Sequence, residues 1–370
     1  MFTFEPLELS RLAPVAELLQ NGVANRVFPG AALAVGYRRS LALLPAGRLS
    51  YAEDAAPVAA DTIYDLASLT KVVATTTMAM ILKDRGRLEL DRPVGRYLPE
   101  FLPPFAEAAG PFWSARQEVT VRHLLAHTSG LPAYDRFFLR ARKKSHLIDE
   151  AVAVPLEEPP GRKTMYSDIG FILLGEILER IAREPLDTFC RREIFEPLAM
   201  SSTGFNPPAE WRPRIAPTEQ DEAFRKRLIW GEVQDENAWV MGGVAGHAGL
   251  FSAAGDLAAF SRMMLEEGQM AGRTLIRSET IREFLLPCPA QQGVPRALGW
   301  DKPSEPSSSG RYFSPASYGH LGFTGTSLWI DPEKRLFVIL LTNRIHPSRA
   351  NEAIRQFRPA LHDAVVEALG

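Results

Sequence analysis

The stretch that most constrains the fold is GTSLWIDPEKRLFVILLTN, residues 325–343. Asp331, Pro332 and Glu333 are turn formers flanked by apolar and aromatic residues, which predicts two strands joined by a turn. The second strand, RLFVILL (335–341), is apolar without alternation. Because neither of its faces suits water, we expect it to lie inside a sheet that is covered on both faces.

The other end of the chain carries matching signals. Residues 8–23 predict a helix, and GAALAVGY (30–37) and GRLSY (47–51) predict two further strands. The closing residues, from about 347 to 369, predict another helix. The simplest packing brings the two ends together in one antiparallel sheet flanked by helices.

The middle of the chain, roughly residues 120–285, is mostly helical in character. Residues 167–184 begin with Ser and Asp and then carry apolar residues at helical spacing. Residues 252–268, which include Asp256, follow the same pattern. No repeat of fixed period is visible in the chain.

These signals predict the α/β fold class, of the α+β type. Residues 1–65 and 286–370 are expected to form the sheet domain, built from both chain ends. Residues 66–285 are expected to form a mostly α-helical inserted domain. A cleft between the two domains is the expected active site.

Composition argues against several classes of function. Lys plus Arg number 42 and Asp plus Glu number 44, and the basic patch RARKK (140–144) is typical of a solvated helix face. We therefore expect no nucleic-acid partner. Cys190 and Cys288 form no disulfide framework or metal pattern, and we expect no metal and no cofactor. HLLAH (123–127) has zinc-helix spacing but lacks the metalloprotease glutamate, which favours a packed helix end.

The compartment and partners are only loosely bounded. No run of 18 apolar residues occurs, so we expect no membrane span. The first residues include Glu5 and Glu8 and lack a basic segment before an apolar run. The chain as given is expected to be cytoplasmic, or periplasmic or extracellular if a leader has been removed. We expect a small-molecule or peptide substrate, and the oligomeric state stays open.

The most informative short motif is LASLTKV (66–72), in which Ser68 and Lys71 lie among apolar residues. The run that follows predicts a helix buried all round, capped by Ser68 or Thr70 and ending near Gly86. Positions i and i+3 share a helix face, so Lys71 Nζ can reach Ser68 Oγ. Desolvation would lower the pKa of Lys71 and suit it to deprotonate the serine. The alternative is a capping serine beside a lysine that reaches the surface.

Two further motifs point to the same chemistry. YSD (166–168) opens a predicted helix, and the Tyr166 phenol can relay protons there; a core tyrosine is the alternative. In HLGFTGTSLW (320–329), His320 precedes a glycine-punctuated strand whose N–H groups can approach a substrate, as an oxyanion hole requires. A competing HAG (247–249) lies in GGVAGHAGLFS (242–252), which is expected to lead into a helix rather than a strand. It ranks second, with the glycines of that segment serving tight packing.

In order and spacing, SLTK (68–71), YSD (166–168) and HLG (320–322) resemble the three motifs of the serine β-lactamases and penicillin-binding proteins. The chain looks most like the class C β-lactamases and their relatives, the D-Ala-D-Ala carboxypeptidases and family esterases. LLAHTSGLP (124–132) and GGVAGHAGLFSAAGDLA (242–258) are similar to scaffold segments of this family. The resemblance therefore spans most of the chain.

The resemblance implies a β-lactamase/transpeptidase-like fold and a covalent mechanism. Ser68 would attack a carbonyl while Lys71 and Tyr166 share the proton transfers. The N–H groups of Ser68 and Phe323 would hold the oxyanion, and water or another acceptor would release the acyl group. The implied substrate-binding residues are Asp168, His320, Gly322 and Phe323.

Two departures from the family pattern leave the substrate open. Asp168 replaces the usual Asn; it cannot donate an amide N–H, and it favours the ammonium form of Lys71, which shifts the base role toward Tyr166. His320 replaces the usual Lys, and a neutral-pH histidine carries at most a partial charge. We expect an acyl-hydrolase acting on amides, D-amino-acid peptides or small esters, with β-lactams third. A penicillin or cell-wall-peptide sensor without turnover is the alternative from another class.

Overall fold

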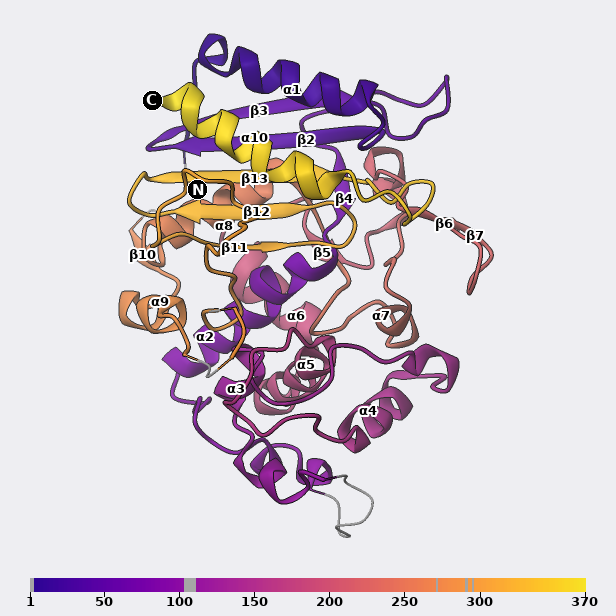
Figure 1. Ribbon diagram of the computed structural model, residues 1–370, viewed down its shortest axis with the longest axis vertical. Coiled ribbons are helices and arrows are strands. Elements are labelled where there is room, and N and C mark those ends of the chain that lie inside the picture. Colours follow the sequence, from indigo (N-terminus) through magenta and orange to yellow (C-terminus); the bar gives the residue numbers. More distant parts are fainter. Residues whose placement is uncertain (1–2, 103–110, 271, 290–291, 295) are drawn as a thin grey trace.

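The computed structural model describes residues 3–102, 111–270, 272–289, 292–294 and 296–370. Its largest sheet joins N-terminal and C-terminal strands in the order β1-β3-β2-β13-β12-β11 (Figure 1). Adjacent strands run antiparallel except β1 and β3. The predicted antiparallel sheet built from both chain ends is therefore confirmed. In spatial order, the strands are Glu5–Pro6, Ser40–Gly47, Gly30–Tyr37, Leu336–Thr342, Ser327–Asp331 and Tyr318–Leu321.

Strand β13 lies in the interior of this sheet, between β2 and β12, as its unbroken apolar sequence predicts. Its alternate side chains enter two apolar clusters. Leu340 packs in the cluster that holds α1 (Ala13–Ala24) and α10 (Ile354–Leu369). Ile339 packs in the cluster that holds α8 (Ala254–Leu265) on the opposite face. Figure 1 shows α1 and α10 crossing one face of the strands together.

The middle of the chain forms the helical part of the molecule. The helices predicted over 167–184 and 252–268 are confirmed as α5 and α8, and Ser167 caps α5 by accepting from Gly170 N–H at 3.1 Å. Among the helices of the described segments, none has both the length and the apolar character needed to span a bilayer. Besides α8, the helices of this part are α2 (Thr77–Asp84), α3 (Val121–Leu125), α4 (Lys144–Ala153), α5 (Asp168–Ala182), α6 (Leu186–Cys190), α7 (Glu236–Val240) and α9 (Ser278–Leu285).

Short strands also occur in this part, which the sequence predicted to be mostly helical, and just before it. They pair as β4-β8-β5, as β6 with β7 and as β9 with β10. Helix α8 belongs to this part by sequence yet packs on the main sheet. The domain boundaries at residues 65 and 286 stay a prediction. The short strands are β4 (Ile63–Asp65), β5 (Gly204–Phe205), β6 (Glu219–Asp221), β7 (Arg227–Ile229), β8 (Leu250–Ala253), β9 (Gln269–Met270) and β10 (Arg273–Thr274).

Two predicted boundaries near the sheet are wrong. The strand expected over 47–51 is Ser40–Gly47, because Gly47 has φ +74° and ends it. This strand was not predicted because it contains Pro45, which usually breaks a strand. The strand tolerates Pro45 because β1 pairs only with Ser40 and Leu41, so that Pro45 lies on an edge of the sheet. The closing helix begins at Ile354 rather than near 347. The segment before it lines the cleft described below.

The helix predicted after Ser68 is confirmed, with an irregular start. A 3₁₀ turn (Ala67–Leu69) and a π-helical turn (Lys71–Thr76) lead into α2, and Gly86 follows its end with φ +65°. The predicted cap by Ser68 or Thr70 is wrong. Thr70 Oγ1 donates to Ala67 O at 2.6 Å and accepts from Leu250 N–H at 3.1 Å, so its hydroxyl is used by neighbouring strand β8.

Candidate active site

Ser68 lies three residues after the end of strand β4, in the 3₁₀ turn that begins the buried helix. The residue before it, Ala67, has φ +46°, a left-handed conformation that costs a residue with a side chain about 1–3 kcal/mol. The buried carboxylate of Asp65 holds this turn by accepting from Ala67 N–H at 2.8 Å and from Gln234 N–H at 2.7 Å. A strained backbone held by buried hydrogen bonds next to a serine is typical of a preorganised reactive site.

Lys71 lies fully buried beneath Ser68. Its Nζ donates to Ser68 Oγ at 2.9 Å and to the backbone carbonyl of His247 at 3.0 Å, and it is 2.7 Å from Asp168 Oδ1. Burial acts to lower the pKa of Lys71, but Asp168 and Tyr166 together outweigh it and raise that pKa above the usual lysine value. The lowering expected from burial is wrong, whereas the expectation that Asp168 favours the ammonium form of Lys71 agrees with this raised pKa, and Lys71 is an ammonium ion in the resting site.

Tyr166 lies next to Lys71 and Ser68. Lys71 Nζ lies 5.0 Å from the centroid of its ring, and the ring of His127 packs at 4.6 Å between centroids. Burial raises the pKa of Tyr166, although the nearby Lys71 and Ser68 act to lower it. The phenol is therefore protonated in the resting site, within reach of the groups that surround Ser68.

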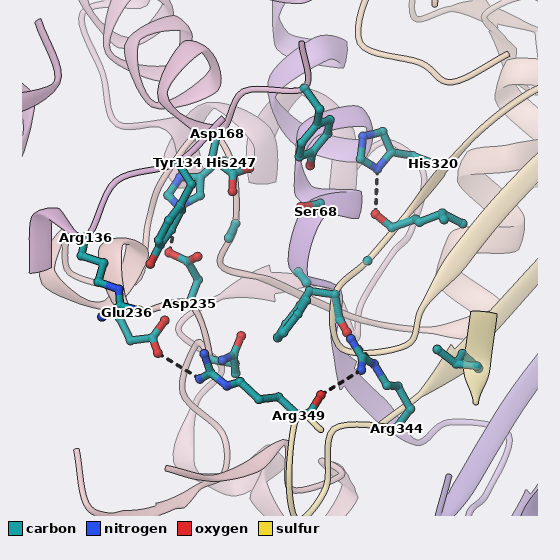
Figure 2. Close-up of a pocket in the computed structure, with 18 of the residues that line it drawn as sticks. Ser68, Tyr134, Arg136, Asp168, Asp235, Glu236, His247, His320, Arg344 and Arg349 are labelled. Atoms are coloured by element: carbon teal, nitrogen blue, oxygen red, sulfur yellow. Dashed lines mark hydrogen bonds and ion pairs between the residues drawn. The ribbon is translucent and has the colours of Figure 1, made fainter. Parts of the chain in front are cut away.

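His320 lies on β11, across the cleft from Asp168 and His247 (Figure 2). It is only 2% exposed, and its Nδ1 is 2.8 Å from Leu321 O. Burial lowers the pKa of His320 to about 4, with Arg296 and Lys71 acting in the same direction. The imidazole is therefore neutral at pH 7 and offers a substrate no fixed positive charge.

Gly322 and Phe323 begin the tight turn between β11 and β12. Gly322 N–H donates to Thr326 O at 2.8 Å and Gly325 N–H donates back to Gly322 O at 3.1 Å. Thr326 Oγ1 donates to Leu66 O at 3.0 Å. Thr324 Oγ1 donates to Asp65 O at 2.7 Å. The turn is thus fastened to the segment that leads into the reactive serine.

Two backbone donors beside this turn have no acceptor. Among the described residues, neither Ser68 N–H nor Phe323 N–H makes a hydrogen bond. Both residues line the same cleft, and the Phe323 side chain is 46% exposed there. Free N–H groups from two separate segments at one site are the donors that an oxyanion requires.

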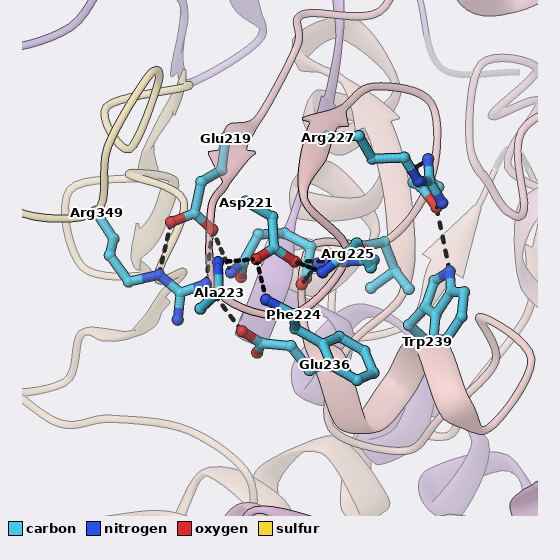
Figure 3. Close-up of polar contacts among 12 residues, drawn as sticks. Glu219, Asp221, Ala223, Phe224, Arg225, Arg227, Glu236, Trp239 and Arg349 are labelled. Atoms are coloured by element: carbon cyan, nitrogen blue, oxygen red, sulfur yellow. Dashed lines mark hydrogen bonds and ion pairs between the residues drawn. The ribbon is translucent and has the colours of Figure 1, made fainter. Parts of the chain in front are cut away.

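The cleft around these groups has a volume of about 900 Å³ and receives residues from both the middle and the C-terminal part of the chain. Tyr134 and Phe224 line it and give it an aromatic surface away from Ser68. Arg349 pins the rim by pairing with Glu219 at 2.6 Å and with Glu236 at 2.9 Å (Figure 3). The cleft therefore combines the polar centre around Ser68 with aromatic side chains and with charged ones, several of them arginines.

The His247 carbonyl and Asp235, which lie behind Lys71, were not among the predicted site residues, although HAG was weighed as a competing motif. The His247 carbonyl accepts from Lys71, while the His247 ring lies 2.8 Å from Asp235 Oδ1. Burial acts to raise the pKa of Asp235, but His247 and a backbone N–H overcome it and lower that pKa to about 2. Gly246 has the predicted packing role, since a Cβ there would lie 2.2 Å from Phe171 O. The glycine-rich segment around HAG was the available signal, but its glycines indicated tight packing and not a carbonyl that accepts from Lys71.

The sequence and fold are similar to those of known proteins. The β-lactamase family model matches residues 15–361. The chain is 34% identical over 317 residues to a protein of Salmonella agona provisionally named D-alanyl-D-alanine carboxypeptidase, covering 80% of this chain and 72% of that one. A relative in Escherichia coli with the same provisional name is 33% identical over 308 residues, covering 77% and 70%.

Solved structures share the fold at lower identity. The hydrolase EstCE1, described as having promiscuous acyltransferase activity, superposes with a TM-score of 0.77 at 20% identity over 96% of this chain and 98% of that one. A penicillin-binding protein homologue from Caulobacter crescentus gives 0.76 at 22% identity over 99% of each chain. The family match across most of the chain and the 34% identical relative agree, and the chain belongs to the β-lactamase family.

Proposed function

We propose that this protein is a serine acyl-hydrolase that works through an acyl-enzyme on Ser68. The observation that carries the proposal is the hydrogen bond from Lys71 Nζ to Ser68 Oγ at 2.9 Å, made by a fully buried amine that also pairs with Asp168. A serine hydroxyl needs such a partner to lose its proton during attack. A capping serine beside a surface lysine does not account for this burial.

The raised pKa of Lys71 decides how the proton leaves. An ammonium group cannot accept a proton unless it gives one up. We assign the acceptor role to Asp168: as Ser68 Oγ–H passes its proton to Lys71 Nζ, Lys71 passes one to Asp168 Oδ1, 2.7 Å away. Asp168 is thereby a proton-transfer group, in addition to the substrate-binding role expected from its motif.

The bond changes then follow in two halves. Ser68 Oγ bonds to the substrate carbonyl carbon, and the free N–H groups of Ser68 and Phe323 stabilise the oxygen as it becomes negative. The bond to the leaving nitrogen or oxygen breaks as Tyr166 O–H gives that atom a proton, and Tyr166 regains a proton from Lys71. Water attacks the acyl-enzyme in the reverse sequence and frees Ser68.

The substrate class is a D-amino-acid peptide, a small amide or an ester. The carboxypeptidase names of the curated relatives favour a peptide. The neutral, buried His320 favours an ester with little peptidase or β-lactamase activity, because it supplies no charge for a terminal carboxylate. The free N–H groups of Ser68 and Phe323 bind the substrate carbonyl in either case, while Gly322, whose N–H already donates to Thr326 O, shapes the turn that presents Phe323.

Mass spectrometry of the intact protein separates these candidates. The enzyme is mixed with a nitrophenyl ester, a D-Ala-D-Ala peptide or nitrocefin, and the acyl adduct and the released product are followed in time, with Ser68→Ala as control. We expect an adduct on wild type that turns over, and none on Ser68→Ala. Labelling of Ser68→Ala would show another nucleophile, and an adduct that forms but is never released would favour a sensor without turnover.

A further inference from the structure

Arg358, near the start of α10, is a buried cation with unusual partners. It is 5% exposed, and its Nη2 donates to the carbonyls of Gly322 and Thr326, each at 2.9 Å. No carboxylate in the described part of the chain lies within the 4.0 Å ion-pair distance of its guanidinium. By contrast, Arg349 on the cleft rim pairs with two glutamates. Arg358 is thus held by backbone oxygens of one turn.

These two carbonyls do not need Arg358 to be satisfied. Gly322 O already accepts from Gly325 N–H at 3.1 Å, and Thr326 O accepts from Gly322 N–H at 2.8 Å. Burying a cation without a counter-ion costs several kcal/mol, and an apolar side chain of similar size is often neutral or stabilising in its place. Stability of the turn therefore does not explain why an arginine occupies this position.

The presence of an arginine at position 358 is better explained by the peptide unit to which it donates. A trans peptide is planar, so its C=O and N–H point in opposite directions within one plane. The carbonyl of Gly322 and the N–H of Phe323 belong to the same peptide unit. Fixing the carbonyl therefore fixes the direction of the N–H, and a cation on the oxygen polarises the unit and makes the N–H a stronger donor.

We propose that Arg358 is a positioning residue: by holding the Gly322 carbonyl, it aims and polarises the Phe323 N–H toward the oxyanion that forms on attack by Ser68. This inference rests on the proposed acyl-enzyme function. Arg344 also holds this turn, since its Nε donates to Phe323 O at 3.0 Å. Arg358 also lines the cleft, and the action proposed for it runs through the backbone of the turn.

Arg358→Met tests the inference, because methionine fills the space without a charge or a donor. The matched control is Arg311→Met. It removes an arginine that is 75% exposed and pairs with Asp363, which lies on α10 as Arg358 does. For each variant we measure kcat and KM for a nitrophenyl ester, the rate of fluorophosphonate labelling, the Kd of phenylboronic acid and the Tm. Boronic acids form a tetrahedral serine adduct and so report on the oxyanion donors in the absence of turnover.

For Arg358→Met we expect kcat and the labelling rate to fall about 10- to 100-fold. This decrease should not exceed the decrease in kcat that follows removal of a whole oxyanion donor. The boronic acid should bind more weakly by a similar factor, with KM unchanged and Tm unchanged or higher. Arg358→Lys, which keeps the charge, should lie between wild type and Arg358→Met. Arg311→Met should behave as wild type.

Two results would overturn the inference. One is wild-type labelling and boronic acid binding in Arg358→Met. The other is a large fall in its Tm, or an Arg358→Lys enzyme no faster than Arg358→Met, since either would make the arginine structural. Absence of labelling in wild type would refute the proposed function instead.

Discussion

Gly322→Ala is the most direct perturbation of the proposed oxyanion site. A Cβ at this position would lie 2.0 Å from Thr326 Oγ1 and 2.5 Å from Leu66 O. It would therefore push apart the hydrogen bond that joins those two atoms at 3.0 Å and fastens the turn to the segment before Ser68. Overpacking of this kind costs about 1–3 kcal/mol, and the lost hydrogen bond adds about 1 kcal/mol.

The larger effect should be on the rate. Moving the turn carries the Phe323 N–H away from the carbonyl oxygen, and loss of one oxyanion donor lowers kcat about 10²- to 10³-fold. KM should change less, because the donor acts mainly on the charge that develops in the transition state. We therefore expect a folded enzyme with a moderately lowered Tm and very slow acylation.

The assay compares fluorophosphonate labelling rates, read by intact mass spectrometry, with Tm values for the same preparations. Gly204→Ala is the control, because a Cβ at Gly204 has no atom within 4 Å. It should label at the wild-type rate. If Gly322→Ala also labelled at the wild-type rate with its fold intact, the turn would not supply an oxyanion donor and the reasoning would fail.

Three further outcomes are expected. Lys71→Met should slow acylation by at least about 10²-fold, as loss of a proton-transfer group does, and an unchanged labelling rate would contradict its role. Asp168→Asn should move the acidic limb of the pH–rate profile to higher pH, because without a carboxylate to take its proton Lys71 works only as the free amine; an unmoved limb would count against Asp168 as acceptor. Burial lowers the pKa of both His320 and His362 from 6.5 to about 4, so the unfolded chain binds their protons first as the pH falls. Each then removes about 3 kcal/mol of stability between pH 6.5 and 4, and urea titrations of His362→Gln should show a shallower loss than wild type.

Patterns that are local in the chain carried much of the fold. The apolar run 335–341 predicted an interior strand, and β13 is one, because a strand with two apolar faces has no stable place at a surface. The strand Ser40–Gly47 was missed because Pro45 reads as a breaker. Only the pairing of β1 with the first two residues of β3 shows that Pro45 lies on an edge, where a missing N–H costs nothing.

The sequence by itself determined which groups could meet around Ser68, because helical spacing brings Lys71 beneath it and the other motifs carry side chains suited to the same chemistry. Only the tertiary structure decided their state. The Asp168 motif already favoured the ammonium form of Lys71, but only the 2.7 Å contact between Asp168 and Lys71 shows that this effect outweighs burial, and His320 is neutral because neighbouring segments bury it. Protonation depends on charges and burial within a few ångströms in space, and residues distant in the chain supply both.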